Sequence, residues 1–404
     1  IVDLVCSSID EDILYVTDGN YVYKSTDGGA TFDFVARDSL ETALFELCGC
    51  TIDNEPITCI DVGYDADDNP FVFIGTKQGV NRPSISGCPT GTFPATVLWI
   101  GEAGYPATWT DLDLGCYGTG DYGTYSIGCA PDFADSKKTF VVVSNTSQTH
   151  VISTIGVTCS WTEVAELVWN CVPDNHFDID AASRIAFPDD WKDTQTLFVG
   201  VVGHTFGGDV YLVTPERAID LNVRGISLGC TGSKYANIIS LDIEGDTDEA
   251  SLIAGAYDNY DDQEPTNVYC STDGGWSWEE SAKDPTGDGI TYVLWYGDSA
   301  LAATSGYECA VSVCCGEEFP CQFWNQISLI ATDIHCVIYS DHSPGYLSDE
   351  SHTLFMLTER SGTQSLFRYD GTYWERVFCS TLVDHDYPQA FQMVLVSPDF
   401  LITN

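Results

Sequence analysis

The amino-acid sequence predicts an all-β fold, a β-propeller of seven four-stranded blades, and three recurring patterns support it. A hairpin with an Asp-Gly-Gly turn occurs twice, at residues 21–34 and 269–279. Asp-Gly between apolar strands is a strong hairpin signal. An aromatic or apolar anchor begins the strand after this turn at seven positions, 46 to 77 residues apart. Upstream of the hairpins, two apolar strands flank an Asp/Pro turn, as at 127–143 and 185–202.

Each repeat therefore holds four strands in chain order. The Asp/Pro turn joins the first strand to the second, and a loop leads on to the hairpin made by the third and fourth. The anchors of the fourth strands are Phe32, Trp109, Trp161, Leu221, Trp278, Trp324 and Trp374. The blades on this interpretation cover residues 1–55, 56–122, 123–180, 181–235, 236–289, 290–333 and 334–389.

Residues 1–389 thus form the propeller, and residues 390–404 add one further apolar strand. An unpaired apolar strand is costly, so we expect it to be paired. It begins an eighth blade, pairs within this ring, or enters a neighbouring copy as a donor strand. The chain begins at Ile1 without a signal peptide, from which we expect a processed or partial chain.

The apolar runs are four to eight residues long and rich in β-branched and aromatic residues, as at 139–143. These lengths and residue types are typical of buried strands. We find no amphipathic helical periodicity. No apolar run reaches the roughly 18 residues that a membrane-spanning helix needs. The sequence therefore predicts a chain built of strands, with no membrane span.

Both Asp-Gly-Gly hairpins match the pattern Ser-x-Asp-x-Gly-x-Thr-Trp. The chain thus resembles the Asp-box propellers, which include sialidases, sortilin-type receptors and bacterial and archaeal cell-surface proteins. In that family the Ser and Asp side chains bond the backbone of the turn, so the resemblance implies a structural role for these residues. The matching residues are Ser25, Asp27, Gly29, Thr31 and Phe32, and Ser271, Asp273, Gly275, Ser277 and Trp278.

The formal net charge of −46 excludes nucleic acid as a partner, because phosphate binding needs the opposite sign. Repulsion among so many carboxylates is expected to make the fold more stable with bound cations or at high ionic strength. Asp65, Asp67 and Asn69 copy the first three ligands of a calcium loop. The glycine and glutamate that complete such a loop are missing, so an ordinary acidic turn is the alternative to calcium.

Seventeen cysteines, without zinc-ligand spacing, indicate an oxidising compartment and therefore an extracellular or cell-surface protein. The sequon at Asn145 fits this location and offers a glycosylation site. Cysteines recur at the fourth and first strands of successive blades, where disulfides would join neighbouring blades. The candidate bridges are Cys6–Cys379, Cys50–Cys59, Cys116–Cys129, Cys321–Cys336 and Cys159–Cys171.

These features predict a non-enzymatic extracellular subunit of a surface layer or filament that associates with other copies of itself. The alternatives are a glycan-acting hydrolase and a propeller module that binds proteins or glycans. A sialidase needs three converging arginines, and only Arg184 falls on a predicted innermost strand. A glycosidase that uses two carboxylates has candidates in Asp61 and Asp242, both on innermost strands.

Overall fold

The computed structural model shows two compact units, described here one by one: residues 1–252 with 271–278, and residues 253–270 with 279–404. No helix among the described residues is long and apolar enough to cross a membrane. The structure describes residues 2–48, 57–77, 96–101, 108–114, 117, 122–145, 148–168, 179–203, 208–223, 236–257, 268–287, 289–296, 299–305, 310–315, 323–327, 336–342, 353–360, 363–369 and 374–379.

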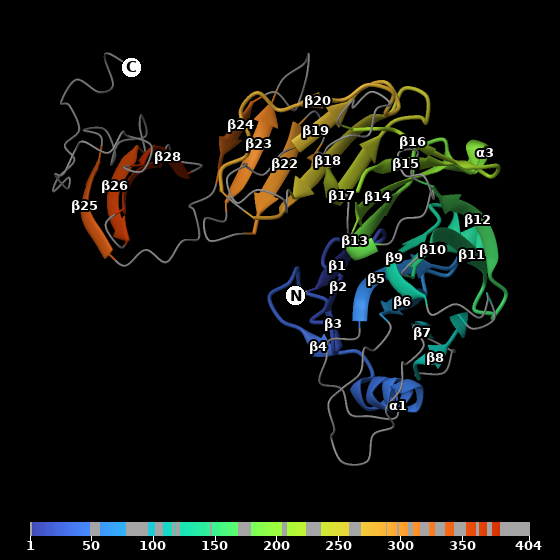
Figure 1. The fold of residues 1–404 in the computed structure, drawn as a ribbon. Helices are drawn as coiled ribbons and strands as arrows, with labels where there is room; N and C mark the ends of the chain where they lie inside the picture. The colour runs from blue at the N-terminus through green and yellow to red at the C-terminus, as the bar shows by residue number, and fades with distance from the viewer. Residues whose placement is uncertain are drawn as a thin grey trace. The chain divides into compact units, whose positions relative to one another are not determined.

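Seven four-stranded sheets make up the fold, each built from strands consecutive in the sequence (Figure 1). The first four sheets are β1–β4 (Asp3–Cys6, Leu14–Thr17, Val22–Ser25, Asp33–Phe34), β5–β8 (Ile57–Tyr64, Pro70–Thr76, Val97–Gly101, Thr110–Asp111), β9–β12 (Gly123–Cys129, Lys138–Ser144, Thr149–Ile155, Thr162–Leu167) and β13–β16 (Ile179–Ala186, Leu197–Gly203, Val210–Val213, Ala218–Asp220). The remaining three are β17–β20 (Asn237–Glu244, Ser251–Tyr257, Val268–Ser271, Glu279–Glu280), β21–β24 (Thr291–Tyr296, Ser299–Thr304, Val311–Cys315, Trp324–Gln326) and β25–β28 (Cys336–His342, Leu354–Arg360, Thr363–Tyr369, Trp374–Cys379). The predicted fold class, an all-β propeller with seven four-stranded blades, is confirmed.

In the first five sheets the first strand lies on the inner side, where it packs against the first strand of the neighbouring sheet. In the first unit β1 packs against β5, β5 against β9, β9 against β13, and β13 against β17. Figure 1 shows β1, β5, β9 and β13 grouped together. The outermost strands β4, β8 and β20 are only two residues long. Polar side chains on the inner strands are therefore brought together, although they come from distant parts of the sequence.

The predicted Asp/Pro turns connect the first and second strands of the third and fourth sheets, and they form the one-turn helices α2 (Phe133–Ser136) and α3 (Trp191–Thr194), which pack against the preceding sheet. Phe133 packs on Phe71 and Phe73 of the second sheet, with ring centroids 5.7 and 6.0 Å away. Trp191 packs on Phe140 of the third sheet at 5.1 Å. Each turn thus places an aromatic ring in the core of the preceding sheet.

A longer helix, α1 (Arg37–Cys48), connects the first sheet to the second, and the prediction that helical periodicity is absent was wrong here. Leu40 and Leu44 are buried, four residues apart, so they lie on one face of the helix. The backbone N–H of Trp109 donates to Ser39 Oγ at 2.8 Å. The helix is therefore held against the outer part of the second sheet.

The two Asp-Gly-Gly turns have the same hydrogen bonds. In the second, Ser271 Oγ donates to Asp273 Oδ1 at 2.8 Å and accepts from Gly275 N at 2.9 Å. Ser277 donates to both Asp273 oxygens, through N at 2.8 Å and through Oγ at 2.6 Å. Gly274 and Gly275 have positive φ angles of 69° and 87°, which side chains disfavour. These contacts stabilise the turn itself, and the likeness to the Asp-box family stays a prediction.

The Asp273→Asn variant is expected to unfold at a lower temperature than the wild type. Burial opposes ionisation of Asp273, but the hydrogen bonds from Ser277 and Ser271 outweigh it and lower the pKa. Because this pKa is lower in the folded state than in the unfolded one, the contribution is present above pH 4 and is lost as the pH falls below. Thermal unfolding at pH 7 and pH 3 measures it. A difference from wild type that is larger at pH 3 would contradict this account.

Three predicted disulfides are not formed, because Cys6, Cys59 and Cys129 are free thiols. Cys59 is only 2% exposed and faces Gly75 inside the packed sheets. Cys159 and Cys270 are disulfide-bonded. The pairings Cys159–Cys171 and Cys321–Cys336 stay predictions, because Cys171, Cys321 and the side chain of Cys336 lie outside the described residues. Cys50, Cys116 and the side chain of Cys379 also lie outside them.

Candidate functional site

Four residues stand out among the charged residues on the inner strands of the first unit. They come from four different sheets: Asp3 on β1, Asp61 on β5, Arg184 on β13 and Asp242 on β17. Asp61, Arg184 and Asp242 are partly exposed, whereas Asp3 is 5% exposed. Charged side chains are rarely placed at packed strands unless they are paired or functional. We therefore examine the partners of each.

Arg184 forms an ion pair with Asp3, with Nη2 and Oδ1 2.8 Å apart. Asp3 Oδ1 also accepts from Leu4 N at 2.9 Å, and its Oδ2 accepts from Ile60 N at 3.0 Å. The buried carboxylate thus has both oxygens satisfied and a guanidinium beside it. The ion pair joins the first sheet to the fourth and holds a positive charge at the inner strands, with 32% of the arginine side chain exposed.

Asp61 has a different environment, because no arginine or lysine neutralises it among the described residues. Its Oδ2 accepts a 2.6 Å hydrogen bond from Cys129 N. Burial raises its pKa, the hydrogen bonds from Cys129 and Val62 lower it, and the charge of Asp3 raises it slightly, to about 6 in all. A carboxyl group with this pKa exchanges its proton in the range where general acids work.

Two of the inner-strand thiols, Cys59 and Cys129, are unreactive near neutral pH. Burial raises the pKa of Cys59 to about 12, and the charge of Asp3 adds to the effect. Burial, followed by the charge of Asp61, also raises the pKa of the Cys129 thiol well above its ordinary value. The thiolate is the reactive form of cysteine, so neither residue is a nucleophile near neutral pH.

The sequence singled out Asp61, Asp242 and Arg184, and the structure places all three on inner strands of one unit. Asp3 was missed, although it pairs with Arg184 and lies near Asp61. A signal for it existed: an arginine on an inner strand needs a counter-ion, and Asp3 occupies the corresponding strand of the first sheet. Because 181 residues separate the two in the sequence, their pairing becomes visible only in the fold.

The calcium candidates lie in the turn between β5 and β6. Asp65 Oδ1 accepts from Asp67 N and Asn69 N, each at 2.9 Å, and both Asp65 oxygens lie 3.1 Å from Asn69 Nδ2. The hydrogen bonds from Asn69 lower the pKa of Asp65 despite opposition from burial. Asp65 thus stabilises the turn, and calcium at this loop stays a prediction.

Asn145 follows β10, and its Oδ1 accepts from Gln148 N at 2.8 Å. The side chain is partly exposed, and its glycosylation stays a prediction. Of the predicted terminal strand, residues 390–404, the structure describes none. Its pairing therefore also stays a prediction.

No protein-family model matches this chain, and no curated protein sequence matches it either. Similar solved structures include YCF48 bound to a D1 peptide, at 11% identity over 92% of this chain and 93% of that one, with a TM-score of 0.45. The α-L-arabinofuranosidase Arb93A of Fusarium graminearum is 10% identical over 76% and 89%, with a TM-score of 0.39. The α-L-arabinanase of Penicillium chrysogenum is 8% identical over 78% and 93%, with a TM-score of 0.40. At these values the likenesses carry no argument about activity.

The prediction that this chain is not an enzyme is not upheld, because the similar structures include an α-L-arabinofuranosidase and an α-L-arabinanase. That prediction relied on the cysteine content, the acidity, the additional terminal strand and the missing catalytic signature, which included the arginine triad of sialidases. The triad belongs to one mechanism only, and a glycosidase with two carboxylates does not need it. A surface-layer or filament role finds no support either, whereas a propeller module does.

Proposed function

We propose that the protein is a glycan-acting hydrolase whose acid is Asp61. The observation that carries the proposal is the state of this one carboxyl group. It is partly exposed on an inner strand, its pKa is about 6, and the Asp3–Arg184 ion pair lies beside it. Such a group is protonated in a mildly acidic solution, yet it loses its proton readily. These are the properties of a general acid.

In this proposal Asp61 gives its proton to the glycosidic oxygen as the bond to the leaving sugar breaks. Glycosidases of the ordinary type need a second, ionised carboxylate. Asp242 is the inner-strand candidate for it, because it is partly exposed on β17, whose neighbour β13 carries Arg184. Its Oδ1 accepts from Ile243 N at 2.9 Å. Arg184 would donate to hydroxyl or carboxylate oxygens of the sugar.

The test is hydrolysis of a panel of polysaccharides and aryl glycosides by the wild type and by Asp61→Asn. The substitution keeps the shape of the side chain and removes its proton, so activity should fall by about 10²–10⁴-fold. Wild-type activity should decrease as the pH rises through about 6, because the acid loses its proton there. Asp33→Asn, at an exposed position on β4, is the matched control and should leave activity unchanged.

Two results would overturn the proposal. One is a folded wild type that cleaves no glycan in the panel. The other is cleavage that survives in Asp61→Asn at its wild-type rate. The extracellular location predicted from the cysteines fits an enzyme that acts on external glycans, and it stays a prediction.

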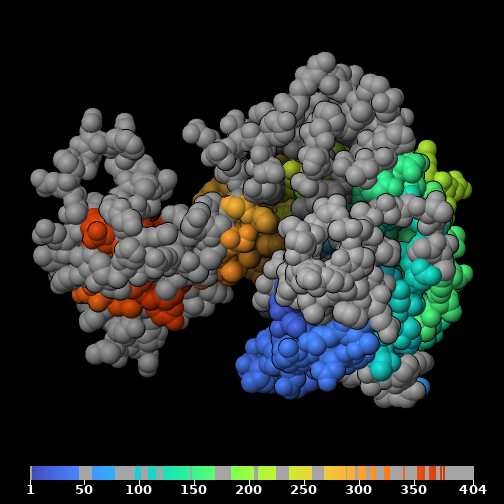
Figure 2. All heavy atoms as spheres, turned by 60° about the horizontal axis from the view of Figure 1, so that its bottom comes forward, coloured from blue at the N-terminus to red at the C-terminus, as the bar shows by residue number. Residues whose placement is uncertain are grey.

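A second candidate, a glycan-binding module, is favoured by an aromatic cluster on the outer strands of the first sheet. Phe34 is 47% exposed and lies 4.8 Å from the Tyr23 ring and 5.5 Å from the Tyr21 ring. The Arg37 guanidinium lies 4.9 Å from the ring centres of both Tyr21 and Phe34. Figure 2 shows residues of the first sheet and α1, in blue, at the molecular surface.

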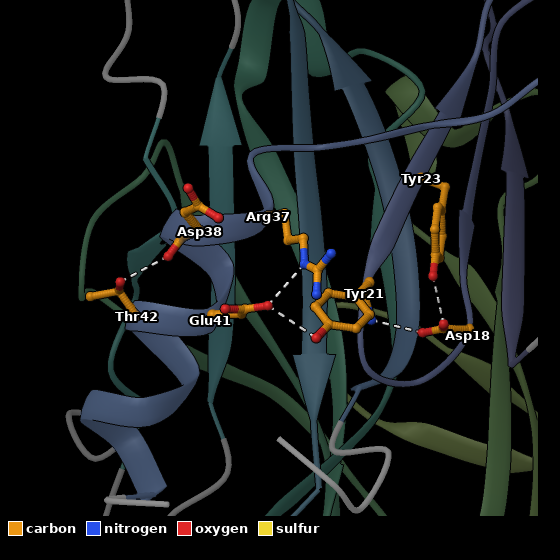
Figure 3. Close-up of polar contacts among 7 residues, drawn as sticks. All are labelled: Asp18, Tyr21, Tyr23, Arg37, Asp38, Glu41 and Thr42. Carbon is orange, nitrogen blue, oxygen red and sulfur yellow. Dashed lines mark hydrogen bonds and ion pairs between the residues drawn. The ribbon is translucent and has the colours of Figure 1, made fainter. Parts of the chain in front are cut away.

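Carboxylates hold these tyrosines in place, as Figure 3 shows. Tyr23 Oη donates to Asp18 Oδ2 at 2.7 Å, and Tyr21 Oη donates to Glu41 Oε1 at 3.0 Å. Burial, together with the hydrogen bond to Asp18, raises the pKa of Tyr23 to about 12. Sugars stack on aromatic rings and bond carboxylates, so Phe34→Ala should abolish retention on glycan arrays. Phe323→Ala, a change at a 60% exposed ring, is the control.

A further inference from the structure

A corner of three rings lies at the outer strands of the third sheet, apart from the inner-strand residues. His150 on β11, Tyr117 and Tyr122 form a triangle whose centroids are 5.9, 5.7 and 5.7 Å apart. The ring planes meet at 67°, 80° and 57°, so the three rings face different directions. Rings that cross at such angles present both faces and edges to one another, and three of them can wall a corner from three sides.

His150 is 6% exposed, and neither of its ring nitrogens has a hydrogen-bond partner among the described residues. Buried polar groups are nearly always paired, and leaving one unpaired is costly. Nδ1 is directed at Glu163 Oε1, but the distance of 3.7 Å is too long for a hydrogen bond. A single donor nitrogen placed beside both atoms could reach each of them at about 2.9 Å.

Glu163 gives this corner a negative charge. Its Oε2 accepts from Tyr117 Oη at 3.0 Å, and 49% of its side chain is exposed. Glu166 pairs with His150 across the two strands β11 and β12 and accepts from Gln148 Nε2 at 3.4 Å. Within the described ranges no lysine or arginine forms an ion pair with Glu163.

We propose that this corner binds an alkylammonium group, with the ammonium N–H shared between Glu163 and His150. A cation placed about 3 Å above the triangle of rings lies about 5 Å from all three centroids, within the ~6 Å reach of cation–π attraction. The carboxylate supplies the opposite charge, and the unpaired imidazole nitrogen supplies the acceptor. The ligand is therefore an amine that is protonated at neutral pH and carries at least one N–H.

Calorimetric titration with three probes tests the proposal at constant ionic strength: trimethylammonium, tetramethylammonium and neutral tert-butanol. Trimethylammonium should bind at least tenfold more tightly than tert-butanol, which has a similar shape and no charge. It should also bind more tightly than tetramethylammonium, which lacks the N–H. Glu163→Gln should weaken the binding of both cations about tenfold. His150→Phe should remove the difference in affinity between trimethylammonium and tetramethylammonium.

Tyr122→Leu should weaken the binding of both cations, whereas Tyr292→Leu, a change at a 40% exposed tyrosine on β21, should have no effect. Equal binding of tert-butanol and the cations, or unchanged binding in Glu163→Gln, would overturn the site. Equal affinities of the two cations would overturn the role of His150. The melting temperature of each variant shows whether it is folded. If Tyr122→Leu fails to fold, the binding measured with Glu163→Gln, a change at a half-exposed position, tests the site instead.

Discussion

Replacing Trp191 by alanine is expected to lower the free energy of unfolding by about 3–5 kcal/mol. The side chain is 1% exposed and fills the core between α3 and the third sheet. It meets Phe140 and Phe187 edge-to-face at 5.1 and 5.0 Å, and Nε1 donates to Asp132 Oδ1 at 3.2 Å. Alanine would leave a cavity and an aspartate without its donor. Urea unfolding followed by circular dichroism measures the loss.

Trp276→Ala is the matched control for this prediction. This tryptophan lies in the second Asp-Gly-Gly turn and is 63% exposed, so its removal should change stability by less than about 0.5 kcal/mol. The same residue type is thus removed once from the core and once from the surface. Equal losses in the two variants would mean that α3 does not join the third and fourth sheets as the contacts indicate.

Replacing Asp209 by threonine should stabilise the protein at pH 8 by about 1–3 kcal/mol, because it removes a buried carboxyl group that must share a proton. Asp209 is 6% exposed, and its Oδ1 accepts from Val210 N and Val223 N at 2.8 and 2.9 Å. Burial raises its pKa well above the ordinary value, and the nearby charge of Asp220 raises it further. The carboxyl pair is stable only while one proton lies between the two groups.

The second sheet shows which side chain suits the position of Asp209. There Thr96 occupies the equivalent place, and its hydroxyl donates to Asp111. The backbone matches in the two sheets, since Leu112 N donates to Val97 O and Leu221 N donates to Val210 O, both at 2.9 Å. A threonine at position 209 would therefore donate to Asp220 at every pH, without the proton that Asp209 needs.

The raised pKa of Asp209 determines how the stability of the wild type changes with pH. A group whose pKa is higher in the folded state stabilises the fold fully below its unfolded pKa, near 4. That stability is lost as the pH rises through the folded value. Wild-type stability should thus decline above pH 4 more steeply than that of Asp209→Thr, and urea unfolding between pH 4 and 9 measures the difference. Parallel curves for the two proteins would contradict this assignment.

The sequence was sufficient for the seven sheets, because alternating strands and turn residues act locally. The Asp/Pro turns gave correct positions for β9, β10, β13 and β14, since the pattern of apolar runs is strong there. Helix α1 was missed because, within residues 37–44, whose burial the structure describes, only Leu40 and Leu44 are buried. So short a pattern is easily taken for the end of a strand.

The cysteine pairings could not be derived from the sequence, because strand position does not fix which way a sulfur points. Cys59 was correctly placed on the first strand of its sheet, yet its side chain faces Gly75 in the interior. The candidate acid Asp61 was found because it lies on an inner strand. Its raised pKa was not predictable, since that depends on burial between sheets and on the hydrogen bond from Cys129.

The short outer strands have a consequence for how other chains can attach. A strand that is added to a sheet gains its affinity from a row of backbone partners, and β4, β8 and β20 are each two residues long. Each also carries an acidic residue: Asp33, Asp111, or Glu279 and Glu280. An extended peptide therefore has very few backbone partners for strand pairing at the outer edges of these three sheets. Recognition at these edges depends on side chains instead.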